Sequence, residues 1–144
     1  MIKVYTDGAC KGNPGPGGWA YVVIDGDKGF SAFGRVEDTT NNRMELSAVI
    51  EALSFLKSRA YTGSVVLYTD SEYVKKGITE WIVSWQANGW KTSAKKPVKN
   101  KDLWISLLEL SSLFSLDWCW VEGHAGNKWN ELCDSMASSA ALGF

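Results

Sequence analysis

Residues 64–70 read Ser-Val-Val-Leu-Tyr-Thr-Asp, and this stretch decides the fold. It is a short apolar run rich in β-branched and aromatic residues, which predicts a strand buried on both faces. Before it, from Asn42 to about Lys57, apolar residues recur with the 3.6-residue period of an amphipathic helix. A helix between two strands is the usual crossover of a parallel pair. The strand at 64–70 is therefore expected beside an earlier, parallel strand.

The earlier strands precede the helix. Residues 2–7 alternate in polarity and predict a strand that ends at Gly8. Residues 12–18 are rich in glycine and proline and predict a loop. Residues 19–24 and 30–36 predict a β-hairpin, because Asp-Gly and Lys-Gly pairs between them supply the positive φ of a tight turn. The first part of the chain is thus an antiparallel meander of three strands.

After residue 70 the pattern gives helices and one more strand. The sequence predicts two short helices over residues 72–76 and 80–86, and then a lysine-rich loop at about 90–101. A longer helix over 102–113, a strand over 116–121 and a last helix over 128–142 follow. Antiparallel strands followed by strands that return through helices predict a mixed α/β fold, with one five-stranded sheet flanked by helices. Because the 144 residues contain no linker, we expect a single domain over residues 1–144.

The composition is that of a soluble globular protein, with 45% hydrophobic and 22% charged residues. No apolar run approaches the roughly 20 residues of a membrane-spanning helix, and no signal-peptide pattern opens the chain. We therefore expect a cytoplasmic protein with no membrane partner. Cys10, Cys119 and Cys133 form no CxxC motif, which argues against a disulfide framework and against a structural zinc site.

The tripeptide Tyr-Thr-Asp occurs twice, ending at Asp7 and at Asp70, each time at the end of a predicted strand. If these strands are parallel neighbours, the two carboxylates lie side by side at the carboxyl edge of the sheet, where α/β proteins build their sites. Like charges this close need a cation or a shared proton, so the pair indicates function. The alternative is that each aspartate only starts a turn or caps the following helix, as Asp70-Ser71 could.

Two further acids lie on helix faces that are predicted to pack against the sheet. Glu45 shares its face with alanine and valine residues, and Asp134 lies among small residues of the last helix. Glu45 also follows Asn42 by three residues, so a capping box that serves only the helix start is the alternative. With the paired aspartates, these acids would complete a cluster of four carboxylates.

A site made of Asp7, Glu45, Asp70 and Asp134 offers only oxygen ligands, which suit Mg²⁺ or Mn²⁺ and not zinc. Two such ions about 4 Å apart can activate a water and stabilise the leaving oxygen of an in-line phosphodiester displacement. The chemistry expected of this cluster is that of a nuclease.

Positive charge is concentrated in one segment, although the whole chain has a formal net charge of -1. Residues 81–101 contain no aspartate or glutamate, and they combine lysines with tryptophans: Lys91, Lys95, Lys96, Lys99, Lys101, Trp81, Trp85 and Trp90. Lysines that neutralise phosphates beside aromatic platforms are typical of nucleic-acid binding. A solvated lysine loop beside packed tryptophans is the alternative.

The only histidine, His124, lies between glycines in Glu-Gly-His-Ala-Gly at 122–126, just before the helix that carries Asp134. A histidine in such a loop can shuttle protons at neutral pH. A surface histidine with no catalytic role is the alternative.

Together these motifs resemble the type 1 ribonucleases H of bacteria, over essentially the whole chain. They occur in the order and spacing of that family: Thr6-Asp7-Gly8, Gly12 to Gly18, Thr39 to Glu45, Thr69-Asp70-Ser71, Gly89 to Thr92, Lys96 to Asn100, Gly123 to Gly126 and Cys133-Asp134. The resemblance implies the ribonuclease H-like fold, in which three antiparallel strands are followed by parallel ones.

The resemblance also implies an activity. The family cuts the RNA strand of RNA–DNA hybrids with two Mg²⁺ ions and leaves a 5′-phosphate and a 3′-hydroxyl. Its metal-binding acids match Asp7, Glu45, Asp70 and Asp134. Its loop histidine, which assists proton transfer or product release, matches His124. We therefore expect a monomeric endonuclease with these five catalytic residues, and Mn²⁺ as a substitute metal.

Further positions match the contacts of the family with its hybrid substrate. Matches to minor-groove and 2′-hydroxyl contacts, by which a protein distinguishes RNA from DNA, fall on Cys10, Asn13, Asn41, Asn42 and Glu45. The remaining matches are a DNA phosphate contact at Thr40, the lining of the DNA channel at Trp81, Trp85 and Trp104, and the basic protrusion at Lys91, Lys95, Lys96 and Lys99.

Two departures from the family pattern concern substrate binding. Glu72 stands where many bacterial members have a glutamine that donates to the substrate, and an ionised glutamate cannot donate. The change would either lower hybrid affinity near the metals or add an acid to the metal site. Gln86-Ala87-Asn88 replaces a basic cluster and Val83-Ser84 replaces polar residues near the phosphate pocket, so we expect weaker, more salt-sensitive binding.

Two other functions share parts of this pattern. A junction resolvase or integrase of the same superfamily would cut DNA, but the asparagines at 41–42 and the glycine-rich segment at 12–18 argue against it. A non-catalytic hybrid-binding module would have lost one of the acids, and all four are present together with His124. The sequence therefore favours an endoribonuclease specific for hybrids.

Overall fold

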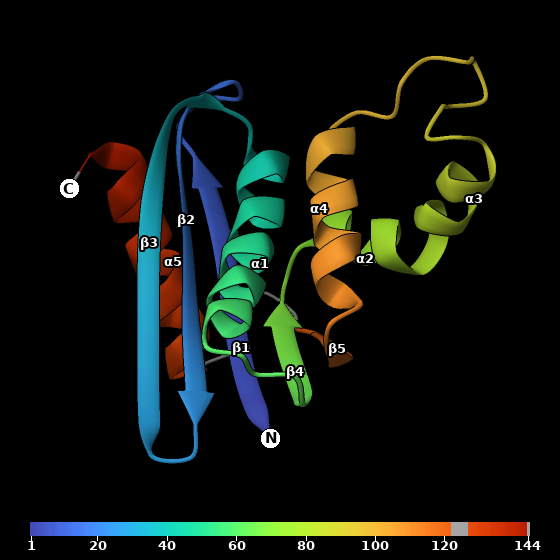
Figure 1. Cartoon of the computed structure of the whole chain (residues 1–144). Helices are drawn as coiled ribbons and strands as arrows, with labels where there is room; N and C mark the ends of the chain where they lie inside the picture. The colour runs from blue at the N-terminus through green and yellow to red at the C-terminus, as the bar shows by residue number, and fades with distance from the viewer. Residues whose placement is uncertain (122–126, 144) are drawn as a thin grey trace.

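The computed structural model describes residues 1–121 and 127–143, which form one five-stranded sheet with helices on both faces (Figure 1). The strands, in the order β3-β2-β1-β4-β5, are β1 Ile2–Cys10, β2 Gly15–Asp25, β3 Lys28–Thr39, β4 Ser64–Thr69 and β5 Ser115–Trp120. The helices are α1 Asn41–Ser58, α2 Glu72–Lys76, η1 Gly77–Trp81, α3 Ile82–Ala87, α4 Lys101–Ser111 and α5 Lys128–Leu142. No helix in the described ranges is both long and apolar enough to cross a membrane. The predicted mixed fold, with antiparallel strands followed by parallel ones, is confirmed.

β1, β2 and β3 form the predicted antiparallel meander, but its strands are longer than the sequence suggests. The glycine-rich segment is a loop only in its first half, because residues 15–18 belong to β2. Gly18 is needed there for close packing and not for a turn, since a side chain at this position would overlap the backbone of α5 at Ala137. The missing side chain thus lets a helix lie close to the sheet.

α1 lies on one face of the sheet and connects the meander to β4 (Figure 1). Its buried residues, among them Leu46, Val49 and Leu53, belong to the main hydrophobic core. β4 then pairs with β1 in parallel, as predicted, with Tyr5 opposite Tyr68. β4 buries one face completely and the other only in part, so the prediction of two buried faces holds for one of them.

α5 covers the opposite face of the sheet (Figure 1). Cys133 is fully buried there against Tyr5 and Val22, and its Sγ donates to the carbonyl oxygen of Tyr5 (3.3 Å). The helix begins after Asn127, whose side chain accepts hydrogen bonds from two backbone N–H groups of the first turn. The central strands therefore lie between two helices, each of which can bring side chains to the carboxyl ends of β1 and β4.

The chain from α2 to α3 is one continuous, irregular helix and not two separate pieces. Residues 77–79, predicted as a break, belong to a π-helical turn, and Gly77 in this turn is buried against the indole ring of Trp104. A cluster of aromatic rings holds the segment, with neighbouring centroids 5.4–6.1 Å apart: Tyr73, Trp81, Trp85, Trp90 and Trp104.

Replacing Gly77 with alanine is expected to destabilise the protein. The added methyl group would overlap the fully buried Trp104 ring, and overpacking a dense core costs about 1–3 kcal/mol. Urea denaturation followed by tryptophan fluorescence measures the loss in the free energy of unfolding. Gly29→Ala is the matched control, because a Cβ there meets its nearest neighbour at an ordinary 3.5 Å. A Gly77→Ala variant as stable as this control would contradict the packing described.

Candidate active site

Asp7 in β1 and Asp70 just after β4 lie next to each other, as the repeated tripeptide predicts. Tyr5 pairs with Tyr68, and each aspartate follows its tyrosine by two residues. The two tyrosine rings stack with their centroids 4.6 Å apart, which supports this register. The alternative that Asp70 caps the next helix is wrong, because Ser71 is the N-cap of α2 and its Oγ accepts from a backbone N–H of that helix (3.1 Å).

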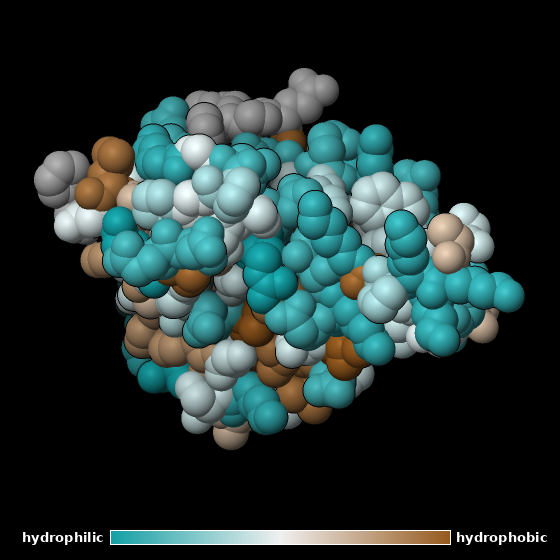
Figure 2. Space-filling model, turned by 90° about the horizontal axis from the view of Figure 1, so that it is seen from above, coloured by the Kyte–Doolittle hydropathy of each residue, from teal (hydrophilic) through white to brown (hydrophobic). Residues whose placement is uncertain are grey.

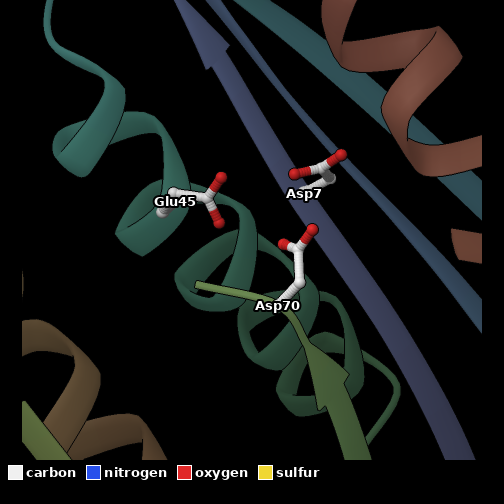
Figure 3. Close-up of side chains that lie close together, drawn as sticks. All are labelled: Asp7, Glu45 and Asp70. Carbon is white, nitrogen blue, oxygen red and sulfur yellow. The ribbon is translucent and has the colours of Figure 1, made fainter. Parts of the chain in front are cut away.

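Glu45 enters the site from α1 (Figure 3). The capping-box alternative is wrong, because Thr40 caps α1 and its Oγ1 accepts from the backbone N–H of Arg43 (3.2 Å). Glu45 Oε1 instead accepts from the backbone N–H of Gly8 (3.2 Å), which also donates to Oδ1 of Asp7 (2.9 Å). Glycine is required at this contact, since a Cβ on Gly8 would overlap the backbone of α1.

The four predicted acids meet at one pocket of about 420 Å³. Figure 3 shows the carboxyl groups of Asp7, Glu45 and Asp70 pointing toward one another, and an oxygen of each lies within 4.8 Å of the others. Asp134 lines the same pocket from α5. Among the described residues, no lysine or arginine lines it, and its other lining residues are Gly8, Asn41, Asn42, Ser71, Glu72 and Tyr73.

The buried acids hold protons more tightly than free carboxyl groups do. Burial, and next the negative charge of Asp70, raises the pKa of Asp7 to about 7. Burial, and next the charges of Asp7 and Asp70, raises the pKa of Glu45 well above its usual value. A hydrogen bond between the two carboxyl groups raises the pKa of Glu45 further and opposes the rise at Asp7. The cluster therefore keeps protons near neutral pH unless a cation takes their place.

This donor set fits a hard divalent cation. Asp7 and Glu45 each expose only 7% of their surface, and Oε2 of Glu45 is buried with no hydrogen-bond partner in the described part of the chain. A buried carboxylate oxygen without a partner is costly unless a cation coordinates it. Three carboxylates that converge at short range suit Mg²⁺ or Mn²⁺.

The glycine-rich loop and the start of α1 meet at the rim of the pocket. Asn13 Oδ1 accepts from the backbone N–H of Asn41 (3.1 Å), which joins the two segments. Cys10 Sγ donates to the carbonyl oxygen of Gly12 (2.8 Å) inside the loop. Asn41 and Asn42 are exposed and line the pocket. The residues matched to minor-groove contacts thus gather on one side of the acids.

The lysine-rich segment extends away from the sheet, at the right of Figures 1 and 2, and Figure 2 shows that mostly hydrophilic side chains cover this face. Trp81 and Trp85 are half-buried, and the lysines matched to substrate contacts are all exposed: Lys91, Lys95, Lys96 and Lys99. The prediction that Trp104 lines the DNA channel is wrong, because its ring is fully buried in the core and cannot contact a substrate directly. Its Nε1 instead donates to the hydroxyl oxygen of Tyr73 (3.0 Å).

His124 lies outside the described residues, so its role in proton transfer stays a prediction. Glu72 is exposed and adds a fifth carboxylate to the lining of the pocket. Ser71 and Tyr73, on either side of Glu72, also line the pocket and were not assigned from the sequence. Their position directly after Asp70 is the signal that would have indicated them.

Comparison with known proteins agrees with this geometry. A family model described as RNase H matches residues 1–142. The chain belongs to the RNase H family. Membership of the RNase H family confirms the resemblance seen in the motifs, and it makes the chain an enzyme of the ribonuclease H class.

RNase H relatives are similar over nearly the whole chain. The ribonuclease H of Treponema pallidum subsp. pallidum is 52% identical over 153 residues, which cover 97% of this chain and 90% of the relative. The ribonuclease H of a Polaromonas species is 55% identical over 140 residues, which cover 96% of this chain and 86% of the relative. The solved structure of LC9-RNase H1, described as a type 1 RNase H with the type 2 active-site motif, is 34% identical with a TM-score of 0.87, over 99% of this chain and 72% of that one.

Removing one charge from this RNase H acid cluster is expected to stabilise the metal-free protein. Because the pKa of Asp7 is raised in the folded state, folding takes up a proton, and stability falls as the pH rises from about 4 to about 7. The free energy of unfolding of Asp7→Asn should therefore exceed that of the wild type by about 1–2 kcal/mol at about pH 8 in a chelator. The difference should shrink toward about pH 4, and urea denaturation at both pH values measures it.

The matched control is Asp117→Asn at an exposed position of β5, which should leave stability unchanged. Added Mg²⁺ should stabilise the wild type and this control more than Asp7→Asn, since a ligand that binds only the folded state raises its stability. If Asp7→Asn is no more stable than the wild type in chelator, the carboxylates do not repel one another in the folded protein.

Proposed function

We propose that the chain is an endoribonuclease that hydrolyses the RNA strand of RNA–DNA hybrids and leaves 5′-phosphate and 3′-hydroxyl ends. The observation that carries the proposal is the convergence of Asp7, Glu45 and Asp70, with Asp134 at the same pocket, in a chain of the RNase H family. All four acids come from one chain, which supports a monomeric enzyme made of a single domain.

The proposed metal ions are two Mg²⁺, for which Mn²⁺ can substitute. Asp7 and Asp70 would contribute to both ions, and Glu45 and Asp134 to one each. Such ions, when bound, supply an activated water and stabilise the leaving oxygen of the phosphodiester. The protein prepares the ligands, because the N–H of Gly8 holds two of the carboxylates in place (2.9 and 3.2 Å).

The rim of the pocket is proposed to recognise the substrate. Asn41 and Asn42 are exposed there, where their amides can exchange hydrogen bonds with 2′-hydroxyl groups, as would Cys10 and Asn13 beside them. The exposed lysines of residues 91–99 would neutralise phosphates of the DNA strand. LC11-RNase H1, which shares the fold with a TM-score of 0.75 at 22% identity, was solved in complex with an RNA/DNA hybrid.

The direct test is cleavage of an end-labelled RNA–DNA hybrid in Mg²⁺, beside double-stranded RNA and double-stranded DNA of the same sequence, each repeated with a chelator. We expect metal-dependent cutting of the RNA strand of the hybrid alone, with products that carry 5′-phosphate and 3′-hydroxyl ends. Binding without cutting would indicate a non-catalytic module, and cutting of DNA would indicate a resolvase. Either result would overturn the proposal.

Asp70→Asn is expected to abolish cleavage while the fold and hybrid binding persist. The amide keeps the size of the side chain and removes the negative charge that a divalent cation requires. Single-turnover cleavage and a hybrid titration measure the two properties, and circular dichroism checks the fold. Asp117→Asn should cleave at the wild-type rate. Retained turnover in Asp70→Asn would contradict the assignment of this acid.

His124→Ala is expected to lower the cleavage rate less severely, by about 10²-fold, as is usual for a proton-transfer group. The rate should be compared with that of the wild type from about pH 6 to about pH 9, where a histidine changes its charge. An unchanged rate across this range would show that His124 takes no part in the reaction.

A further inference from the structure

Side-chain hydrogen bonds that meet at Tyr73 tie the lysine-rich segment to the acid-lined pocket. Tyr73 is half-buried, lies three residues after Asp70 and lines the pocket. Its hydroxyl oxygen accepts two hydrogen bonds, from Nε1 of Trp104 (3.0 Å) and from Nδ2 of Asn100 (3.1 Å). One oxygen atom of a residue that lines the pocket therefore holds two residues of a distant part of the chain.

Asn100 attaches one end of the lysine loop, residues 88–100, to the rest of the protein. Its backbone is in the left-handed region (φ 60°), and its carbonyl oxygen accepts from two N–H groups at the start of α4 (3.1 and 3.0 Å). Its side chain is held at both ends, because Oδ1 accepts from Nη1 of Arg43 (3.2 Å) and Nδ2 donates to Tyr73. These hydrogen bonds therefore fix the orientation of the end of the loop relative to α4 and Tyr73.

The lysine loop is closed by its own hydrogen bonds. The N–H of Thr92 donates to the carbonyl oxygen of Lys96 (2.8 Å), and the N–H of Val98 donates to that of Trp90 (3.0 Å). Val98 is buried, which fixes the base of the loop against the core. The lysines are thus carried by a structured unit whose placement depends on its attachment.

The Arg43 side of the attachment leads to α1. Arg43 lies two residues before Glu45 and holds the carboxylate of Asp102, at the start of α4, through two hydrogen bonds (3.1 and 2.8 Å). The loop and this acid-bearing helix are therefore joined by directional contacts.

The Tyr73 side of the attachment leads to the segment after β4. Ser71, between Asp70 and Tyr73, is fixed by two hydrogen bonds: its N–H donates to Oγ1 of Thr69 (3.2 Å) and its Oγ accepts from the N–H of Val74 (3.1 Å). Movement of Tyr73 relative to Asp70 is therefore restricted. Both partners of the Asn100 side chain are thus close in sequence to an acid of the site: Arg43 to Glu45, and Tyr73 to Asp70.

We propose that Tyr73 is a positioning residue that sets the separation between the lysine loop and the acid cluster, and so selects which phosphodiester bond of a bound hybrid is cut. This inference rests on the proposed hydrolysis of hybrids. Successive bonds of a strand differ by roughly 3 Å along a duplex. A duplex held by the loop therefore presents one bond to the acids only if loop and acids keep a fixed separation.

Tyr73→Phe tests the proposal, because it removes the shared acceptor and keeps the ring that packs against Trp81 and Trp104. On an end-labelled hybrid of fixed sequence, the variant should spread its cuts over neighbouring bonds. Its KM should rise about 3- to 10-fold, as expected when hydrogen bonds at one acceptor are lost. The salt dependence of binding should stay at its wild-type slope, since every lysine remains.

Tyr61→Phe is the matched control, because its hydroxyl donates to the carbonyl oxygen of Ser64 (2.7 Å) where β4 begins, at the end of the strand away from the acids. It should leave the cutting pattern and KM unchanged. Asn100→Ala should also spread the cuts over neighbouring bonds, because it removes the donor to Tyr73. The effect of the double variant should be smaller than the sum of the single effects, because the two changes share the Tyr73–Asn100 hydrogen bond.

Hydrogen exchange of the amides at residues 92–96 and 98 gives a measurement that does not depend on cleavage, and it should be faster in Tyr73→Phe than in the wild type or Tyr61→Phe. A wild-type cutting pattern or unchanged exchange in Tyr73→Phe would overturn the proposal. If Tyr73→Phe does not fold, a wild-type cutting pattern or unchanged exchange in Asn100→Ala would overturn the proposal instead. A wild-type protein that cuts no hybrid would overturn the proposed function. The exchange data would still show whether Tyr73 holds the lysine loop in place, so the two failures can be distinguished.

Discussion

The parallel pairing of β1 with β4 is the constraint on which the site depends. With Tyr5 opposite Tyr68, the register brings Asp7 beside Asp70 at one edge of the sheet. A shift of one residue would turn a carboxylate to the other face, because side chains alternate along a strand. The stacked tyrosines and the buried side of β4 stabilise the register that the charges oppose. Packing along the strands thus supports a cluster that is unfavourable by itself.

The two faces of the sheet contribute one further acid each, and both depend on small residues. α1 brings Glu45 close to β1 because Gly8 has no side chain to obstruct the helix backbone. α5 brings Asp134 to the same pocket and lies close to β2 at Gly18 for the same reason. Glycine is therefore needed at these two positions because the helix backbone lies too close to the strand for any side chain.

Much of the fold and of the acid cluster could be predicted because it is encoded locally, in polarity periods and in a repeated tripeptide. The sheet-facing side of Glu45 was also predicted, but its spacing suits a capping box as well, and only the cap at Thr40 excludes that alternative. The resemblance places Trp104 in the lining of the DNA channel, but its ring is fully buried and packs against Gly77 of another helix. Side-chain partners that are distant in sequence, such as Asn100 for Tyr73, leave no local pattern.

The aromatic cluster joins the protruding segment to the main hydrophobic core, and this has a consequence for evolution. The rings occupy the inside, whereas residues 86–88 and the lysines lie outside it. Surface charge in this segment can therefore change by single substitutions while the acid-bearing edge of the sheet stays as it is. Gln86, Ala87 and Asn88 are exposed on this surface. Changes in the surface charge of this segment and changes in the acid cluster can thus be inherited separately.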